Sequence, residues 1–482
     1  MLKRNRKWFA FFALLVIASL ALTACGQSNT GTGQSGEQGQ QEQGQQAEYD
    51  ENGYLVVNLG EEPPSLDPQK ATDTVSFEVL GATYEGLVRR DPETNAFKPG
   101  GGMALDWQVS EDGTKYTFKL RQDNKWSDGQ PVTAHDFEYA WKRAVDPRTA
   151  SQYAFIVGDY IKGGKAVMEA KGDEAIEKAL ENFGVKAVDD YTLEVTLEKP
   201  VAWFISLLEF GTYRPVRKDI VEKYGDKFAT EADTAVYSGP FMITEWEHNN
   251  RLKLEKNPHY WDAENVKLSY IEFKMIKEND TVVNLYETGE LDAIGVPSTH
   301  VEIFEQNYKD EMGEWLDGGT FYLMFNTEKK PWNNPKARRA VSLAIDRKTY
   351  IDSIRKGAGV AAQGFTNPVI TAPDQSGSFY EKYVAPLNLI PVEGDKEQAK
   401  QLWEQALQEE GISGTVKAEL LCYDTDTALL DCQYFQQQVK DALGLELTIK
   451  QVPFDQKLEL SKQGKYEINY AGWGPDYDHP LT

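Results

Sequence analysis

The sequence predicts an α/β or α+β protein of two or three lobes, and three observations support this. Its 482 residues are about three times the length of a typical domain, so the chain should contain more than one core. Apolar residues make up 40% of the chain and charged residues 26%, which suits folded cores and not a disordered chain. Strand-like and helical segments mix along the chain without a fixed repeat period, which argues against a solenoid or a propeller.

Residues 1–24 are predicted to be a secretory signal peptide. Four basic residues precede an uncharged run from Trp8 to Leu22, and small residues follow it. As a helix this run would be about 22 Å long, short of the roughly 30 Å hydrocarbon core of a membrane. It ends in Leu-Thr-Ala-Cys, which resembles the lipobox of bacterial lipoproteins and makes Cys25 the expected lipidated residue. The alternative is an ordinary signal peptide with a chance cysteine.

Residues 25–48 are predicted to be the lipidated cysteine and a flexible linker. From Gly26 to Glu48 the chain has no aromatic or branched aliphatic residue. Such a segment cannot bury enough apolar surface to offset the entropy lost on ordering it. As a flexible chain it would span roughly 26 Å, so the folded body should lie close to a membrane.

The folded body, from residue 49 onward, contains short apolar or alternating segments that are typical of strands. These predicted strands are Tyr54–Leu59, Lys115–Arg121, Tyr191–Glu198, Arg251–Glu255, Ile271–Ile276, Phe321–Asn326, Glu446–Val452 and Tyr466–Ala471.

Three helices are predicted with defined ends. Thr133 and Asp136 form a capping box at the start of the first, and Phe137, Ala140, Trp141 and Ala144 share one face of it. The second is expected to run from Pro335 to a C-terminal Gly357. Its inward face would consist of Ala337, Ala340, Val341, Ala344 and Ile345. The third, Asp395–Glu410, should stop at Gly411.

Charge and motif content argue against several classes of function. A net charge of −25 would repel nucleic acid. Three cysteines exclude a disulfide scaffold and a cluster of cysteine-rich metal sites. Nucleophile elbows, phosphate-binding loops and zinc-helix motifs are absent from the sequence. We therefore expect neither an enzyme nor a bound cofactor or metal.

Two weaker features remain open. Asp476, Asp478 and His479 are residue types that chelate cations, although spacing alone is a weak indication. Cys422 and Cys432 could form a disulfide bond outside the cytoplasm or remain two buried thiols, and the sequence favours neither.

Longer phrases of the body resemble the solute-binding proteins of the oligopeptide and dipeptide ABC-importer family, and above all its oligopeptide-binding members. The resemblance extends from Tyr54 to the end of the chain. The order and spacing of the phrases make it specific. They begin at Ser65 (SLDP), Tyr84 (YEGLV), Lys125 (KWSDGQPVTAHDF), Asp146 (DPRTASQYA), Asn257 (NPHYW), Gly289 (GELD), Asn334 (NPKARRA) and Gly472 (GWGPDY).

This resemblance implies a two-lobed clamp of the type II periplasmic-binding-protein class, with an extra domain, that closes around a ligand. Lobe I would comprise residues 49–84 and 238–319, the extra domain residues 85–237, and lobe II residues 320–482. In the family, several dozen more residues follow the point where this sequence ends. We therefore expect lobe II to be truncated at its C-terminus.

The resemblance also implies a ligand site. In the family a peptide adds as an extended strand between main-chain segments of the two lobes, so that its side chains need not be recognised. The matching aspartate would bind the peptide α-ammonium, and Tyr470 and Ser461 stand where relatives carry arginine, with Lys462 adjacent. Core packing is the alternative for Trp473 and Tyr153, and a turn for the aspartate. The implied ligand-binding residues are Thr72, Asp73, Thr74, Tyr153, Gly472, Trp473, Gly474 and Asp476.

These expectations describe a monomeric lipoprotein, anchored through Cys25 to the outer face of a bacterial cell membrane, most simply in a Gram-positive organism. It would bind oligopeptides and deliver them to the permease subunits of an ABC transporter. The same scaffold could instead bind a dipeptide, a nickel chelate, haem or an oligosaccharide, or act as a sensor of peptide signals.

Overall fold

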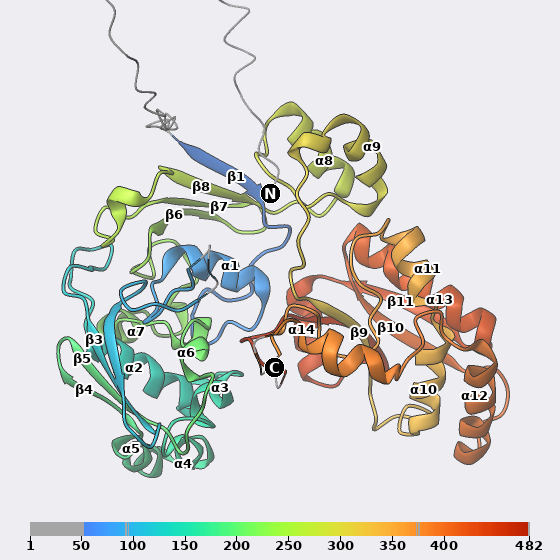
Figure 1. The fold of residues 1–482 in the computed structure, drawn as a ribbon, viewed down its shortest axis with the longest axis horizontal. Helices are drawn as coiled ribbons and strands as arrows, with labels where there is room; N and C mark the ends of the chain where they lie inside the picture. The colour runs from blue at the N-terminus through green and yellow to red at the C-terminus, as the bar shows by residue number, and fades with distance from the viewer. Residues whose placement is uncertain (1–52, 92–93, 95, 373, 375, 481–482) are drawn as a thin grey trace, which may run out of the picture.

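The computed structural model describes residues 53–480, except residues 92, 93, 95, 373 and 375. The expected signal peptide, Cys25 and linker lie outside the described residues. The described chain forms two halves with a four-stranded sheet in one and two such sheets in the other (Figure 1). This agrees with the predicted mixed fold of more than one lobe.

The first sheet joins the N-terminal strand to three strands from the middle of the chain, in the order β1-β8-β7-β6. β1 pairs with β8 in parallel, whereas the other two pairings are antiparallel. The elements associated with this sheet are β1 (Tyr54–Asn58), α1 (Thr74–Thr83), β6 (Phe241–Glu247), β7 (Arg251–Lys256), β8 (Tyr270–Lys274), α8 (Asn279–Thr288) and α9 (Val301–Asn307).

The second sheet is wholly antiparallel, in the order β2-β3-β5-β4, and belongs to the same half. The Thr133–Asp136 capping box forms as predicted, and the apolar face of α2 is fully buried. The elements are β2 (Ala104–Val109), β3 (Lys115–Leu120), α2 (Ala134–Val145), α3 (Ala154–Gly158), α4 (Gly164–Glu169), α5 (Asp173–Glu181), β4 (Val185–Asp189), β5 (Thr192–Thr196), α6 (Phe204–Leu207) and α7 (Lys218–Tyr224).

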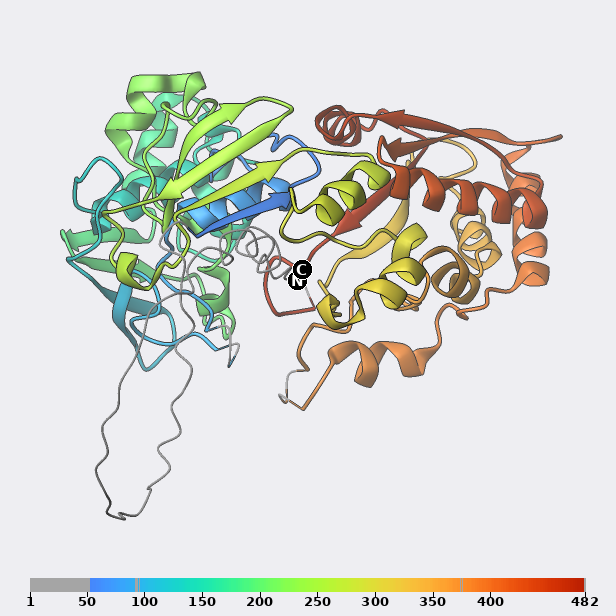
Figure 2. The ribbon, with the colours of Figure 1, turned by 90° about the horizontal axis from the view of Figure 1, so that it is seen from above.

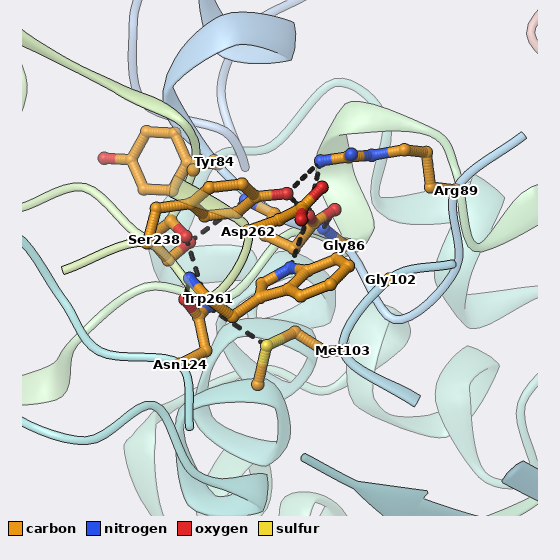
Figure 3. Close-up of polar contacts among 12 residues, drawn as sticks. Tyr84, Gly86, Arg89, Gly102, Met103, Asn124, Ser238, Trp261 and Asp262 are labelled. Carbon is orange, nitrogen blue, oxygen red and sulfur yellow. Dashed lines mark hydrogen bonds and ion pairs between the residues drawn. The ribbon is translucent and has the colours of Figure 1, made fainter. Parts of the chain in front are cut away.

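A buried polar cluster joins these two sheets at the point where the chain passes from one to the other (Figure 3). Glu85 is 3% exposed, and its Oε2 accepts hydrogen bonds from Arg89 at 2.6 Å, the Tyr260 hydroxyl at 2.5 Å and the Trp261 indole at 3.2 Å. Its backbone N–H donates to the Ser238 hydroxyl. One continuous hydrophobic core spans both sheets, so this half is packed as a single body.

The third sheet forms the other half, which we call lobe II, in the order β11-β10-β12-β9. β11, β10 and β12 are parallel, and β9 runs antiparallel at the edge. A separate core lies between this sheet and α10, α12 and α13. The elements are β9 (Thr320–Phe325), α10 (Pro335–Ala344), α11 (Arg347–Thr349), α12 (Lys396–Glu410), β10 (Lys417–Tyr423), α13 (Asp426–Leu443), β11 (Glu446–Val452), α14 (Phe454–Lys462) and β12 (Ile468–Trp473).

Two predicted helices of lobe II had different outcomes. α12 begins after Asp395 and ends at the left-handed Gly411, as predicted. The predicted single helix from Pro335 to Gly357 is wrong, because α10 ends at Ala344 and Ile345 is extended. The Asp346 side chain then accepts from the Thr349 N–H and hydroxyl and starts a new helical turn. Asp346, which the prediction placed inside one long helix, is instead the N-cap of a second helix.

Short 3-10 and π segments connect the longer elements. They are Pro147–Thr149, Gly211–Tyr213, Gly225–Lys227, Ala263–Asn265, Ser298–His300, Lys309–Glu311, Tyr350–Ile354, Tyr380–Val384 and Ala385–Leu387. Seen from above, α8 lies beside the start of α13 of lobe II (Figure 2), and the Asn279 side chain donates a hydrogen bond of 3.4 Å to the Thr427 hydroxyl. Among the described residues, every helix is too short or too polar to cross a bilayer.

A candidate ligand site between the two halves

The carboxyl ends of the parallel strands in both halves face one another. Asp424 follows β10, and its carboxylate lies 2.9 Å from the ammonium of Lys277, which follows β8 in the other half. Lys277 also pairs with Glu61, which follows β1, at 3.0 Å. Ligands of open α/β sheets bind outside the carboxyl ends of the strands. The space between the halves is therefore the expected place for a ligand.

Asp476 and Tyr153 meet across this boundary. Asp476 follows β12 of lobe II, and Tyr153 precedes α3 of the other half. The Tyr153 hydroxyl donates a hydrogen bond of 3.2 Å to Asp476 Oδ1. Burial, together with the neighbouring Asp476 carboxylate, raises the pKa of Tyr153, so the phenol stays protonated and remains a donor. Two of the residues implied by the family resemblance thus form one polar pair.

Trp473 lies beside this pair. Its ring centre is 6.4 Å from that of Tyr153, which in turn packs 4.9 Å from Phe210. The Trp473 indole N–H is buried and has no hydrogen-bond partner among the described residues. Trp473 and Tyr153 therefore form an aromatic wall next to the Asp476 carboxylate.

Gly472 and Gly474 differ in what surrounds them. A Cβ at Gly472 would lie 2.8 Å from the exposed Phe321 ring of the neighbouring strand β9, so a larger residue there would have to displace that ring. A Cβ at Gly474 would lie 4.0 Å from the methyl group of Thr74 in the other half. Gly474 and Thr74, both implied ligand residues, thus face each other across the boundary.

Asp73 precedes α1 in an extended conformation, and Thr74 is the first residue of that helix. The Asp73 carboxylate caps this helix, accepting from the Ser76 N–H at 2.8 Å and the Ser76 hydroxyl at 2.9 Å. Burial raises the pKa of Asp73, and these hydrogen bonds oppose that rise. The Asp73 side chain is therefore committed to the fold, whereas its backbone and the exposed Thr74 remain beside the boundary.

Sequence reasoning missed a second set of contacts across the boundary. The hydroxyls of Tyr160 and Tyr477 lie 3.1 Å apart, and the His479 ring stacks on Trp203 with centres 4.2 Å apart. Asp478 instead accepts from the Thr371 N–H at 2.7 Å within lobe II. No local pattern could indicate these partners, because they are hundreds of residues apart in sequence.

Several other predicted positions have structural partners. The Tyr470 hydroxyl donates to buried Asp431 at 2.8 Å, and Ser461 accepts from Asn469 at 2.7 Å. Cys422 and Cys432 are both buried free thiols. The described residues contain no cluster of three metal-ligating side chains, and Asp476, Asp478 and His479 contact different partners.

A pocket of about 440 Å³ lies between the first half and the start of α14 in lobe II. Its lining includes Lys70, Phe228, Trp246, Lys277, Phe454 and Asp455. The eight implied ligand residues do not line it. This pocket is therefore a second space between the halves, separate from the region around Asp476.

Comparison with known proteins identifies the fold. Residues 98–482 match the model of the bacterial extracellular solute-binding proteins, family 5 middle. The oligopeptide-binding protein OppA of Bacillus subtilis is 35% identical, over 99% of this chain and 83% of its own length. An oligopeptide ABC transporter substrate-binding domain from Bacillus anthracis superposes with a TM-score of 0.81 at 39% identity, over 89% of this chain and 80% of that one.

Two further structures indicate the arrangement of the halves. Listeria monocytogenes OppA bound to peptide superposes with a TM-score of 0.79 at 33% identity, covering 89% of this chain and 82% of its own. The unliganded open form of the murein tripeptide-binding protein MppA gives only 0.56 at 28% identity, over 90% and 80% of the two chains. The halves therefore lie as in the bound relative, not as in the open one.

The family match covers most of the chain, and the described fold has the two halves of the clamp that the sequence predicted. Members of this family are transport receptors and not enzymes, in agreement with the missing catalytic motifs. The chain belongs to the family 5 bacterial extracellular solute-binding proteins.

Proposed function

We propose that this protein binds peptides between its two halves and delivers them to an ABC permease. The contact of Asp476 with Tyr153 between the halves carries the proposal. A carboxylate placed there can form a charge-assisted hydrogen bond with a peptide α-ammonium, and that bond strengthens when closure removes water. Every free peptide has this ammonium, so the site would fix the register of the ligand without reading its side chains.

Main-chain pairing would supply the remaining affinity. The extended Asp73 before α1 and the Gly472–Gly474 segment at the end of β12 lie on opposite sides of the boundary. A peptide strand between them can bond to both backbones. Trp473 and Tyr153 would cover its first residue. The eight implied ligand residues fit this role together, with Asp73 contributing its backbone.

The finer parts of the proposal concern location and organisation. We assign lobe I to residues 49–84 and 238–319, the extra domain to 85–237 and lobe II to 320–482. The lipobox-like sequence supports a lipid anchor at Cys25 on the outer face of a cell membrane, behind a signal peptide of residues 1–24. We propose a monomer, because a single chain provides both sides of the site.

Calorimetry with trialanine and N-acetyl-trialanine tests the function. Wild-type protein should bind trialanine at least tenfold more tightly, because acetylation removes the charge that Asp476 meets. Asp476→Asn should remove most of that difference. Asp441→Asn, which changes an exposed carboxylate elsewhere on lobe II, should leave it unchanged. Equal binding of the two peptides by the wild type would refute the role of Asp476, and binding of neither would refute the peptide receptor.

A further inference from the structure

Cys422 and Cys432 meet inside lobe II. Cys422 is the next-to-last residue of β10, and Cys432 lies on α13, which packs against that strand. The Cys422 thiol donates a hydrogen bond of 3.3 Å to the carbonyl of Ala428. In an α-helix that carbonyl also accepts from the N–H four positions later, which here belongs to Cys432. The Cys432 thiol itself forms a hydrogen bond with the Cys422 thiol, so the two sulfur atoms are neighbours.

The cysteine content of the chain makes this meeting informative. The sequence has three cysteines, and the first, Cys25, belongs to the lipobox-like tetrad at the far end of the linker. Cys422 and Cys432 are the only two cysteines of the described residues, and both are fully buried. A single pair of cysteines, brought together from a strand and a helix, is the arrangement expected of a disulfide bond.

The surroundings of the protein favour the oxidised form of this pair. The family to which the chain belongs consists of extracellular proteins, and disulfide bonds form and persist in oxidising compartments outside the cytoplasm. Two reduced thiols that only fill space in a core are typical of cytoplasmic proteins. Contact between the thiols and an extracellular location therefore both indicate a bond.

We propose that Cys422 and Cys432 form a disulfide bond after export, which links β10 to α13. The structure describes the reduced form of this pair. One thiolate attacks the disulfide of a thiol oxidoreductase and forms a mixed disulfide, and the second cysteine then displaces the oxidoreductase sulfur. The two cysteines lose two protons and two electrons, and the oxidoreductase disulfide gains them as a dithiol. Because both thiols are buried in the fold, this exchange precedes the packing of α13 on β10.

The bond would hold the end of β10 that faces the other half of the protein. Tyr423 directly follows Cys422, and its hydroxyl contacts the N–H of Gly472 in the proposed peptide strand. The next residue, Asp424, pairs with Lys277 of the other half at 2.9 Å. A covalent link at Cys422 would therefore restrain the backbone that carries both groups. It would also lower the conformational entropy of the unfolded lobe.

Thiol trapping of the exported protein tests the bond. Full-length mature protein from a bacterial host that exports it is denatured in iodoacetamide, which alkylates every free thiol. Trypsin then releases both cysteines in one peptide, residues 418–440, because no lysine or arginine lies between them. The wild-type peptide should carry no alkyl group, should lack two hydrogen atoms of the dithiol form, and should take up two alkyl groups only after reduction. Cys432→Ala should carry one alkyl group without reduction, which shows that the reagent reaches this peptide.

Thermal unfolding tests the link between β10 and α13. Reduction should lower the melting temperature of the wild type by roughly 5 °C. The double variant Cys422→Ala/Cys432→Ala has no bond to lose, so reduction should leave its melting temperature unchanged.

Two alkyl groups on the wild-type peptide without prior reduction would overturn the proposal. A wild-type melting temperature that does not respond to reduction, with the bond present before and absent after, would show that the bond does not stabilise lobe II. Both measurements are independent of peptide binding, so failure of the proposed function and failure of this inference can be told apart.

Discussion

The Tyr153 hydroxyl donates a 3.2 Å hydrogen bond to Asp476, from one half of the protein to the other. The two residues are 323 positions apart in sequence. Tyr153 is 7% exposed, and its ring packs against Phe77 and Phe210 of its own half. This pair links ligand chemistry to closure, because the bond can form only when the halves are together.

Tyr153→Phe should weaken trialanine binding about fivefold, because a hydrogen bond to a partly exposed carboxylate contributes about 1 kcal/mol. The preference for trialanine over its N-acetyl form should persist, since Asp476 keeps its charge. Calorimetry measures both. Tyr383→Phe, at an exposed tyrosine of lobe II, is the matched control. Unchanged affinity in Tyr153→Phe would contradict a positioning role for the phenol.

The parts of the fold that sequence predicted well have local causes. Thr133 and Asp136 cap each other within one turn, and Gly411 adopts the left-handed conformation that ends α12. The sequence could not show that the helix from Pro335 ends before Asp346, because its apolar spacing continues through Ile345. Only the capping hydrogen bond from the Thr349 N–H to the Asp346 side chain marks the start of a new helix. β2, β4, β6 and β10 were not predicted as strands; β10 lies inside its sheet, and the other three are edge strands.

The candidate site, too, was predicted only in part. Asp476, Trp473 and Tyr153 came from family phrases, and the structure brings them together, but physical reasoning on the sequence alone could not pair them. The stack of His479 on Trp203 and the triad of Lys277 with Glu61 and Asp424 arise only from long-range folding.

Gly472→Ala should destabilise lobe II by about 1–3 kcal/mol, because the new methyl group would lie 2.8 Å from the Phe321 ring. Urea unfolding measures this loss. Phe321 is 58% exposed, so Phe321→Ala should relieve the overlap, and the double variant should recover part of the stability. Additive losses in the double variant would show that the two positions do not clash.

Glu85→Gln should cost about 3 kcal/mol of unfolding free energy. The substitution leaves the partly buried Arg89 without its charged partner and replaces an acceptor of three hydrogen bonds with an amide. Urea unfolding at neutral pH provides the measurement. Glu209→Gln is the matched control, since its ion pair with Arg90 is more exposed and should contribute under about 1 kcal/mol. Equal losses in the two variants would argue against a joining role for Glu85.

Lys457→Met should stabilise the protein at pH 7, because this lysine is 2% exposed and its ammonium lies 3.8 Å from the centre of the Tyr423 ring. The folded-state pKa of about 8 lies below the ordinary lysine value of 10.5, so between these values the unfolded chain binds more protons than the folded one. Wild-type stability should therefore rise with pH through that window, and the methionine variant should lack this rise. At pH 7 we expect the variant to be about 1–4 kcal/mol more stable, as when other buried charges are replaced by apolar groups. Urea unfolding from pH 7 to pH 10.5 measures both effects. A less stable variant with the wild-type pH dependence would mean that the buried ammonium does not destabilise the fold.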